Sequence, residues 1–278
     1  MYRSSKICAP FFAACLLAMI IAAMIDSRFE VGVPRTGAQD NVTLTISAAS
    51  DLTFAFEELG ALFEEETDIE IEFNFGSTGQ LAQQIEAGAP IDIFAAANVS
   101  FIEGLDEAGL IVPGSDQLYG RGRIVVWTQA ESPLKFGELA DVADASVERI
   151  AIANPDHAPY GFAAKEALQS TGIWEDIQDR LILGENVSDT LRYGTTGNVD
   201  VAIVALSLAI QADGDWFLVP EELHTPIDQS LAIIVGTEHE EEARAFIEFL
   251  SSEEGRAIMS SFGFVLPVEG LPAATPTT

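Results

Sequence analysis

Four short turns in the sequence place residues with a hydroxyl group, or glycine and proline, directly before an expected helix. They are Ser50-Asp51, Gly76-Ser77-Thr78-Gly79, Pro159-Tyr160-Gly161 and Asn186-Val187-Ser188. A helix N-terminus leaves its first backbone N–H groups without an acceptor, and such groups bind anions. None of the four turns contains Lys or Arg, so together they would form an uncharged, donor-only site. We therefore expect the chain to bring these turns together around one small oxyanion.

The candidate binding residues each offer a hydroxyl or a backbone N–H group at one of the turns: Ser50, Ser77, Thr78, Tyr160 and Val187. Asp51 and Gly161 are further candidates through their backbone N–H groups, because a bare carboxylate that points at an anion is unfavourable. Each hydrogen bond to a charged partner contributes ~1.5–3 kcal/mol, so six or seven could hold a dianion without a counter-charge. Taken singly, each turn could instead be only a helix cap or a plain loop.

A catalytic interpretation has less support in the sequence. Of the three histidines, only His157 lies near a candidate turn. A small hydrolase that uses His157 with Ser50 and Asp156 can be imagined, but a bond from His157 to loop backbone is the simpler reading. No Gly-x-Ser-x-Gly elbow and no cysteine cluster is present. We therefore expect no catalytic residue, no cofactor and no metal ion bound directly by the protein.

The elements that must position the turns alternate between strands and helices. Apolar or alternating runs predict strands at 43–49, 69–75, 91–96, 123–127, 149–153, 181–183, 199–206, 216–219 and 230–235. Helical spacing predicts helices from Leu52 onward, around Leu191, and at 80–87, 99–108, 136–142, 162–170, 240–250 and 254–261. Such alternation predicts an α/β fold with mainly parallel sheets flanked by helices. Ligands then lie at the carboxyl ends of the strands, where all four turns are expected.

We expect two lobes, because the chain crosses to a second group of strands and later returns. Residues 39–128 and 221–268 would form the first lobe, and residues 129–220 the second. Residues 269–278 read as a flexible tail. Arg3 and Lys6 precede an almost wholly apolar run at 7–25, so residues 1–38 read as a signal peptide or signal-anchor with a linker.

Charge and cysteine content limit the possible partners. The chain has a formal net charge of −31, and residues 1–38 contribute +2, which leaves −33 for the remainder. Such a surface repels nucleic acid and anionic membranes and would also repel an anion at long range, so any anion site must work by short-range hydrogen bonds. The acidity itself fits solubility in an exposed compartment. Both cysteines lie in the export segment, so the exported part has no disulfide.

Several segments in combination resemble the molybdate-binding proteins of ABC importers: 48–52, 76–90, 154–161, 164–168 and 184–188. The resemblance runs from about residue 44 to residue 264. It implies a two-lobed periplasmic binding protein of type II that closes over molybdate or tungstate in its cleft and works with a membrane permease. The oxyanion donors implied match Ser50 or Asp51 in the first turn, Ser77 or Thr78, Tyr160 and Val187.

One position departs from the family pattern. Some members have a tyrosine donor near the end of the late apolar strand, where this chain has Ala205. The Tyr160 side chain or a backbone group could replace that donor.

From these observations we expect an exported, monomeric solute-binding protein for molybdate or tungstate. These ions carry no proton at neutral pH, which suits an all-donor pocket. Sulfate is an alternative that pocket size would have to exclude. Phosphate is another, because Asp51 could accept its proton. An adhesive surface domain would fit the acidity but leaves the turns unexplained.

Overall fold

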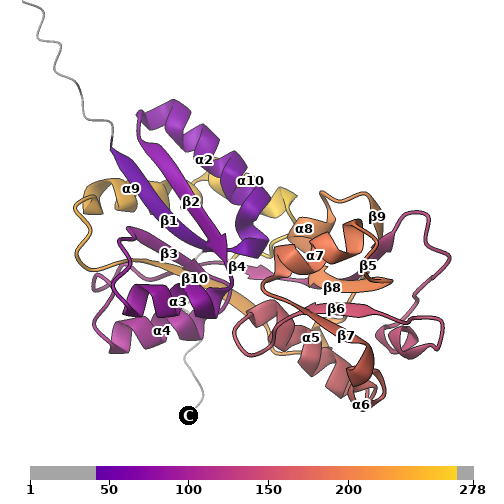
Figure 1. The fold of residues 1–278 in the computed structure, drawn as a ribbon. Helices are drawn as coiled ribbons and strands as arrows, with labels where there is room; N and C mark the ends of the chain where they lie inside the picture. Colours follow the sequence, from indigo (N-terminus) through magenta and orange to yellow (C-terminus); the bar gives the residue numbers. More distant parts are fainter. Residues whose placement is uncertain (1–41, 268–278) are drawn as a thin grey trace, which may run out of the picture. The chain divides into compact units, whose positions relative to one another are not determined.

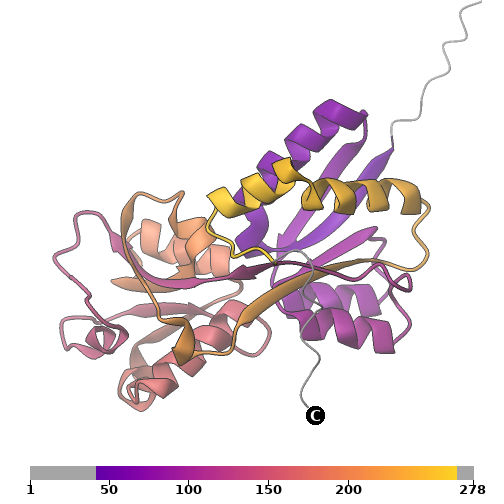
Figure 2. The same cartoon turned by 180° about the vertical axis from the view of Figure 1, so that it is seen from behind.

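The computed structural model describes residues 42–267 and contains two five-stranded sheets flanked by helices (Figures 1 and 2). The expected two-lobed α/β class is confirmed. The export segment and linker expected at 1–38 and the tail expected at 269–278 lie outside the described residues. Within 42–267, no helix is long and apolar enough to cross a membrane.

The first lobe is built on a sheet with strand order β2-β1-β3-β10-β4. Its strands are β1 (Thr43–Ala49), β2 (Glu70–Gly76), β3 (Ile93–Ala96), β4 (Gln117–Gly122) and β10 (Ile227–Ile233). Its helices are η1 (Ser50–Leu52), α2 (Thr53–Thr67), α3 (Thr78–Glu86), α4 (Val99–Glu107), α9 (Glu240–Ser251) and α10 (Glu253–Ser261).

The second lobe is built on a sheet with strand order β7-β6-β8-β5-β9. Its strands are β5 (Ile124–Gln129), β6 (Ile150–Ala153), β7 (Leu181–Gly184), β8 (Val201–Ala205) and β9 (Gly214–Leu218). Its helices are α5 (Pro159–Ser170), α6 (Trp174–Ile177), α7 (Val187–Thr195), α8 (Leu206–Ala209), η2 (Leu139–Ala143) and η3 (Gln178–Arg180). A short turn of helix, η4 (Glu221–Leu223), lies on the way back to the first sheet.

Strand pairing is mixed in both sheets, where mainly parallel sheets were expected. β1 pairs in parallel with β2 and β3, and β6 pairs in parallel with β7 and β8. β10 is antiparallel to β3 and β4, and β5 is antiparallel to β8 and β9. The antiparallel strands β5 and β10 are those that follow a crossing between the sheets. They need not run in the direction that a βαβ crossover within one sheet imposes.

The chain first crosses between the sheets earlier than expected, at Arg123, where β4 has ended and β5 is about to begin. Residues 124–128 therefore belong to the second sheet and not to the first lobe as the sequence suggested. Their apolar run fits a buried strand in either sheet, so the pattern could not decide between them. The chain returns between β9 and β10.

Two ion pairs lie where the chain leaves the first sheet and where it returns to it. Arg121 Nε lies 2.6 Å from Asp228 Oδ1, and Arg123 Nε lies 2.8 Å from Glu221 Oε1. In the ladder between β4 and β10, Arg121 is also the partner of Asp228. The two connections between the lobes are therefore held side by side.

Trp127 on β5 is one of the largest buried side chains in the core of the second lobe. Its side chain is only 1% exposed, and two glycines approach it closely. A Cβ atom added at Gly194 of α7 would lie 2.7 Å from the indole ring, and one added at Gly214 would lie 2.4 Å from it. Glycine is therefore needed at both positions, because a larger side chain would clash with the tryptophan ring where it packs against helix α7 and strand β9.

We predict that Gly194→Ala lowers the free energy of unfolding by ~1–3 kcal/mol, because the added methyl group overpacks the Trp127 ring. Chemical denaturation monitored by tryptophan fluorescence measures the change. Gly104→Ala is the matched control, since Gly104 is also helical and a Cβ there meets no atom within 4 Å. That control should be neutral or stabilising by up to ~1 kcal/mol. Equal effects of the two substitutions would contradict the packing argument.

Candidate functional site

The four predicted turns lie at the carboxyl ends of parallel strands, two in each sheet. β1 leads into η1 and β2 into α3, while β6 leads into α5 and β7 into α7. The registers bring the ends level: Ala49 pairs with Gly76 in the first sheet, and Ala153 pairs with Gly184 in the second. Each sheet therefore presents two helix starts at one edge, as the alternation of elements predicted.

These turns line a small pocket with a cavity volume of about 10 Å³. Its lining consists of Ala49, Ser50, Asp51, Gly76, Ser77, Thr78, Ala97, Ala158, Pro159, Tyr160, Asn186 and Val187. All five predicted binding residues and Asp51 are in the lining, whereas Gly161 is not. None of the lining residues is Lys, Arg or His. That volume is roughly the space that one water-sized sphere occupies, so the pocket suits a small ion and not a larger organic ligand.

The starts of three helices direct backbone donors to this pocket. Thr78 and Val187 are the first residues of α3 and α7, and Tyr160 is the second residue of α5 after Pro159. The N–H groups at these positions have no acceptor within their helices. Among the described residues, none of these three N–H groups has a hydrogen-bond partner. They remain available to a ligand.

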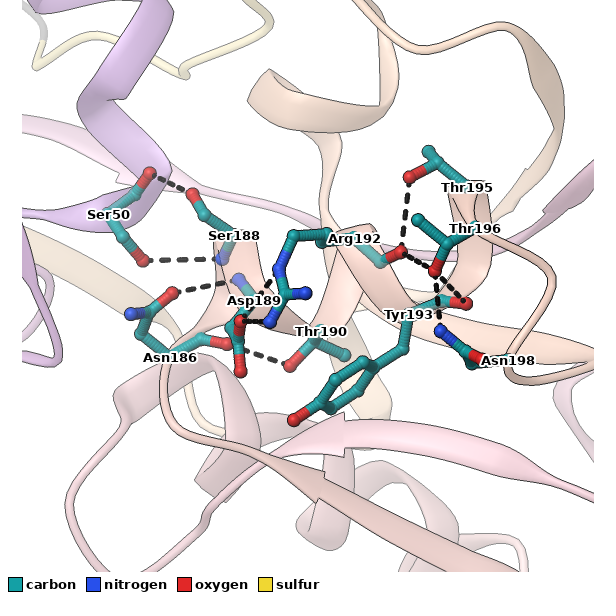
Figure 3. Close-up of polar contacts among 10 residues, drawn as sticks. All are labelled: Ser50, Asn186, Ser188, Asp189, Thr190, Arg192, Tyr193, Thr195, Thr196 and Asn198. Carbon is teal, nitrogen blue, oxygen red and sulfur yellow. Dashed lines mark hydrogen bonds and ion pairs between the residues drawn. The ribbon is translucent and has the colours of Figure 1, made fainter.

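Ser50 joins the two lobes at one side of the pocket (Figure 3). The Ser188 hydroxyl of α7 donates to the Ser50 carbonyl oxygen at 2.8 Å, and the Ser188 N–H lies 3.4 Å from Ser50 Oγ. Asn186 caps the same helix by accepting from the Asp189 N–H at 2.9 Å. Because Ser50 Oγ acts here as an acceptor, its own proton is free for a ligand.

Ser77 joins the lobes at another side. Its hydroxyl lies 2.7 Å from both the carbonyl oxygen and Nδ1 of His157, and the Gly79 N–H donates to the same carbonyl at 2.9 Å. His157 therefore contacts the other lobe through Ser77. The hypothetical hydrolase arrangement required it to contact Ser50 or Asp156, and no such bond is found among residues 42–267. Thr78 Oγ1 accepts from the Ala97 N–H at 3.2 Å, which leaves its proton free.

The Tyr160 side chain does not replace the donor missing at Ala205. Its hydroxyl is already engaged, because it donates to Asp51 Oδ2 at 2.9 Å in a buried hydrogen bond. Ala205 is fully buried at the end of β8, and the nearby Ser207 donates to the Asp51 carbonyl oxygen at 2.7 Å. Tyr160 can therefore serve a ligand through its backbone N–H, while its ring ties the two lobes together.

Asp51 is the acidic residue in the pocket lining and is only 1% exposed. Its Oδ2 atom accepts from Tyr160 and, at 2.7 Å, from Gln229 Nε2. The Tyr119 hydroxyl donates to Gln229 Oε1 at 2.9 Å and so extends the network. Burial raises the pKa of Asp51 to about 7, and the hydrogen bonds from Gln229 and Tyr160 limit that rise.

Sequence reasoning did not assign Gln229, Tyr119 or the Ser188 hydroxyl to the site. Gln229 is fully buried on β10, just before the apolar run that was expected to be the strand. A lone amide beside such a run signals a buried polar partner, but it does not say which partner. Ser188 was part of a predicted turn, where only the neighbouring backbone N–H was given a role.

Comparison with known proteins agrees with this architecture. The family model for bacterial extracellular solute-binding proteins matches residues 44–265. The molybdate-binding protein ModA of Rhodobacter capsulatus is 34% identical over 221 residues, which cover 79% of this chain and 86% of that protein. YvgL of Bacillus subtilis, named as a candidate substrate-binding lipoprotein of an ABC transporter, is 33% identical over 91% of this chain and 96% of its own length.

A solved structure is similar over most of the described residues. The periplasmic molybdate-binding protein of Azotobacter vinelandii superposes with a TM-score of 0.77 at 29% identity. The match covers 81% of this chain and all of that chain. The chain therefore belongs to the family of bacterial extracellular solute-binding proteins.

Proposed function

We propose that this protein captures molybdate or tungstate outside the cytoplasm and delivers it to an ABC permease. The observation that carries the proposal is the convergence of three helix starts and the Ser50 hydroxyl on one small pocket without Lys or Arg in its lining. Relatives and a solved structure named for molybdate binding support the choice of ligand.

The chemistry of the lining favours an anion that carries no proton. The N–H groups of Thr78, Tyr160 and Val187 and the hydroxyls of Ser50 and Thr78 would donate to the oxide oxygens. Ser77 would contribute through its backbone N–H, because its hydroxyl already contacts His157. The protein would hold the molybdenum only through these oxygens, with no direct ligand to the metal.

Two other tetrahedral oxyanions are the alternatives. Sulfate also lacks a proton at neutral pH but is smaller, so its shorter bonds would leave some donors out of reach. Monohydrogen phosphate needs an acceptor for its proton, and the Asp51 carboxyl in the lining could supply one.

The protein would act as an exported monomer that meets a permease at the membrane. Its export segment would either be cleaved or keep the chain anchored through residues 7–25. Closure of the lobes would bury the ligand and create the surface that the permease recognises.

We predict that calorimetric titration gives tight, one-to-one binding of molybdate and tungstate, weak binding of sulfate and no binding of phosphate. Affinity should change little between low and high salt, because a closed, neutral site is poorly screened. Preferential phosphate binding would make Asp51 an acceptor and assign the protein to another importer. Binding of none of the four anions would refute the proposed function.

A second prediction concerns Ser50. Ser50→Ala should weaken molybdate binding about tenfold or more, since a hydrogen bond to a charged partner contributes ~1.5–3 kcal/mol. Ser115→Ala is the control, because Ser115 is a buried serine that bonds the Ile233 N–H outside the pocket. Its substitution should lower the thermal stability and leave the affinity unchanged. An unchanged affinity in Ser50→Ala would remove that hydroxyl from the site.

A third prediction concerns the contact between the lobes at Gly79. A Cβ atom there would lie 2.8 Å from the carbonyl oxygen of His157, so Gly79→Ala forces the lobes apart at this point. We expect at least a tenfold loss of molybdate affinity, mainly through faster dissociation. Stopped-flow displacement measures the rate, and Gly104→Ala serves as the control. An unchanged dissociation rate would show that this contact is not needed for closure.

A further inference from the structure

The Asp51 carboxyl has an oxygen that the protein leaves without a partner. Oδ2 accepts the hydrogen bonds from Tyr160 and Gln229, whereas Oδ1 is buried and has no hydrogen-bond partner among the described residues. A buried polar atom without a partner is costly, so its retention needs an explanation. Asp51 also lines the anion pocket, and a bound anion is therefore a possible partner for this oxygen.

The titratable groups that face this carboxyl are two buried tyrosines. Tyr160 comes from α5 and contacts it directly, and Tyr119 comes from β4 and reaches it through Gln229 of β10. Burial and the charge of Asp51 raise the pKa values of both phenols, so both stay protonated donors. Neither can supply a counter-charge to an ionised Asp51.

The other elements that pack against η1 add no cation toward this group. On α7, Asp189 and Arg192 form an ion pair with each other. All five glutamates of α2 and the two of β2 are exposed, and α8 has no charged residue. The Asp51 carboxyl therefore lies in an uncharged, protein-filled environment beside the place where an anion would be bound.

We propose that Asp51 is a specificity-determining ligand that binds the oxyanion as a neutral carboxylic acid, with Oδ1–H as an additional hydrogen-bond donor. The inference rests on the proposed function. Capture of a fully deprotonated tetrahedral dianion is then coupled to the uptake of one proton by the free protein. The hydrogen bonds to Oδ2 orient the group, so that the proton resides on the oxygen that has no other partner.

The direction of the pH effect follows from linkage. The pKa of Asp51 is about 7 in the empty protein, and a bound dianion raises it further because the two negative charges repel. Well below pH 7 the acid is already neutral and the affinity is constant. Above pH 7 each bound anion must bring one proton, so the affinity falls by up to tenfold per pH unit.

The test is calorimetric titration of the full chain with molybdate from about pH 6.5 to about pH 9, a range in which the free anion carries no proton. Measurements at pH 8 in buffers of different ionisation enthalpy count the protons taken up. We expect nearly one proton for the unsubstituted chain and none for Asp51→Asn. The asparagine keeps an oxygen for Tyr160 and Gln229 and offers an N–H in place of Oδ1–H. Its affinity should stay at the low-pH value throughout.

His157→Gln is the matched control, because the His157 ring also contacts a residue of the lining, Ser77, but does not contact Asp51. The pH dependence should persist in this variant. If it disappears in His157→Gln and persists in Asp51→Asn, the proposal is wrong. Binding of molybdate with no proton uptake would overturn this inference and leave the proposed function intact. Failure to bind molybdate, tungstate or sulfate at any pH would overturn both.

Two further measurements guard against a folding defect in Asp51→Asn. Tyr160→Phe removes a hydrogen bond that lowers the pKa of Asp51 and keeps the backbone donor, so the fall in affinity should begin at higher pH. An unchanged pH midpoint would contradict the proposal.

In the empty protein, the raised pKa of Asp51 means that the contribution of this group to the free energy of unfolding is lost as the pH rises from about 4 to about 7. Asp51→Asn should therefore gain melting temperature over the unsubstituted chain across that range, and a constant difference would count against a neutral Asp51.

Discussion

A buried dianion without a cationic side chain beside it can be held only by hydrogen-bond donors that are already in position. Desolvation of such an ion costs free energy, and each hydrogen bond from a donor offsets a small part of it. The donors must therefore be numerous, fixed and without acceptors of their own. Backbone N–H groups at helix starts meet these conditions, because the rest of the helix holds them in place. This requirement explains why the lining is rich in small residues and has no Lys or Arg.

The topology supplies the donors in pairs. In each sheet, two parallel strands end level with one another, and each leads into a helix or turn that points to the same edge. One sheet alone would cover only one side of a tetrahedral ion. Two sheets, joined by contacts such as Ser188 with Ser50 and Gly79 with His157, enclose it from opposite sides. In the proposed function, the second lobe contributes two of the three helix starts and is therefore more than a cover for the site.

Most of this arrangement could be predicted from local sequence. The turns, the helices that follow them and the five pocket residues depend on patterns within a few positions, such as Pro159 at the first position of α5. The bonds from Tyr160 and Gln229 to Asp51 could not be predicted, because each joins residues more than 100 positions apart. The same limit applies to the crossing at Arg123 and to the antiparallel strands β5 and β10. Their hydrophobic patterns fit either sheet and either direction.

The ion pairs between the two crossings have a consequence for kinetics. Arg121 with Asp228 and Arg123 with Glu221 are partly exposed, so each adds little to the stability of the fold. They tie the outgoing and returning connections to each other, so we expect these connections to bend together. Two connections that bend together define one axis of rotation, whereas two independent connections would also permit twisting. If the lobes open about this axis, we expect release of the ligand to show one relaxation time. Salt would alter that time through these ion pairs and not through the hydrogen-bond donors of the pocket.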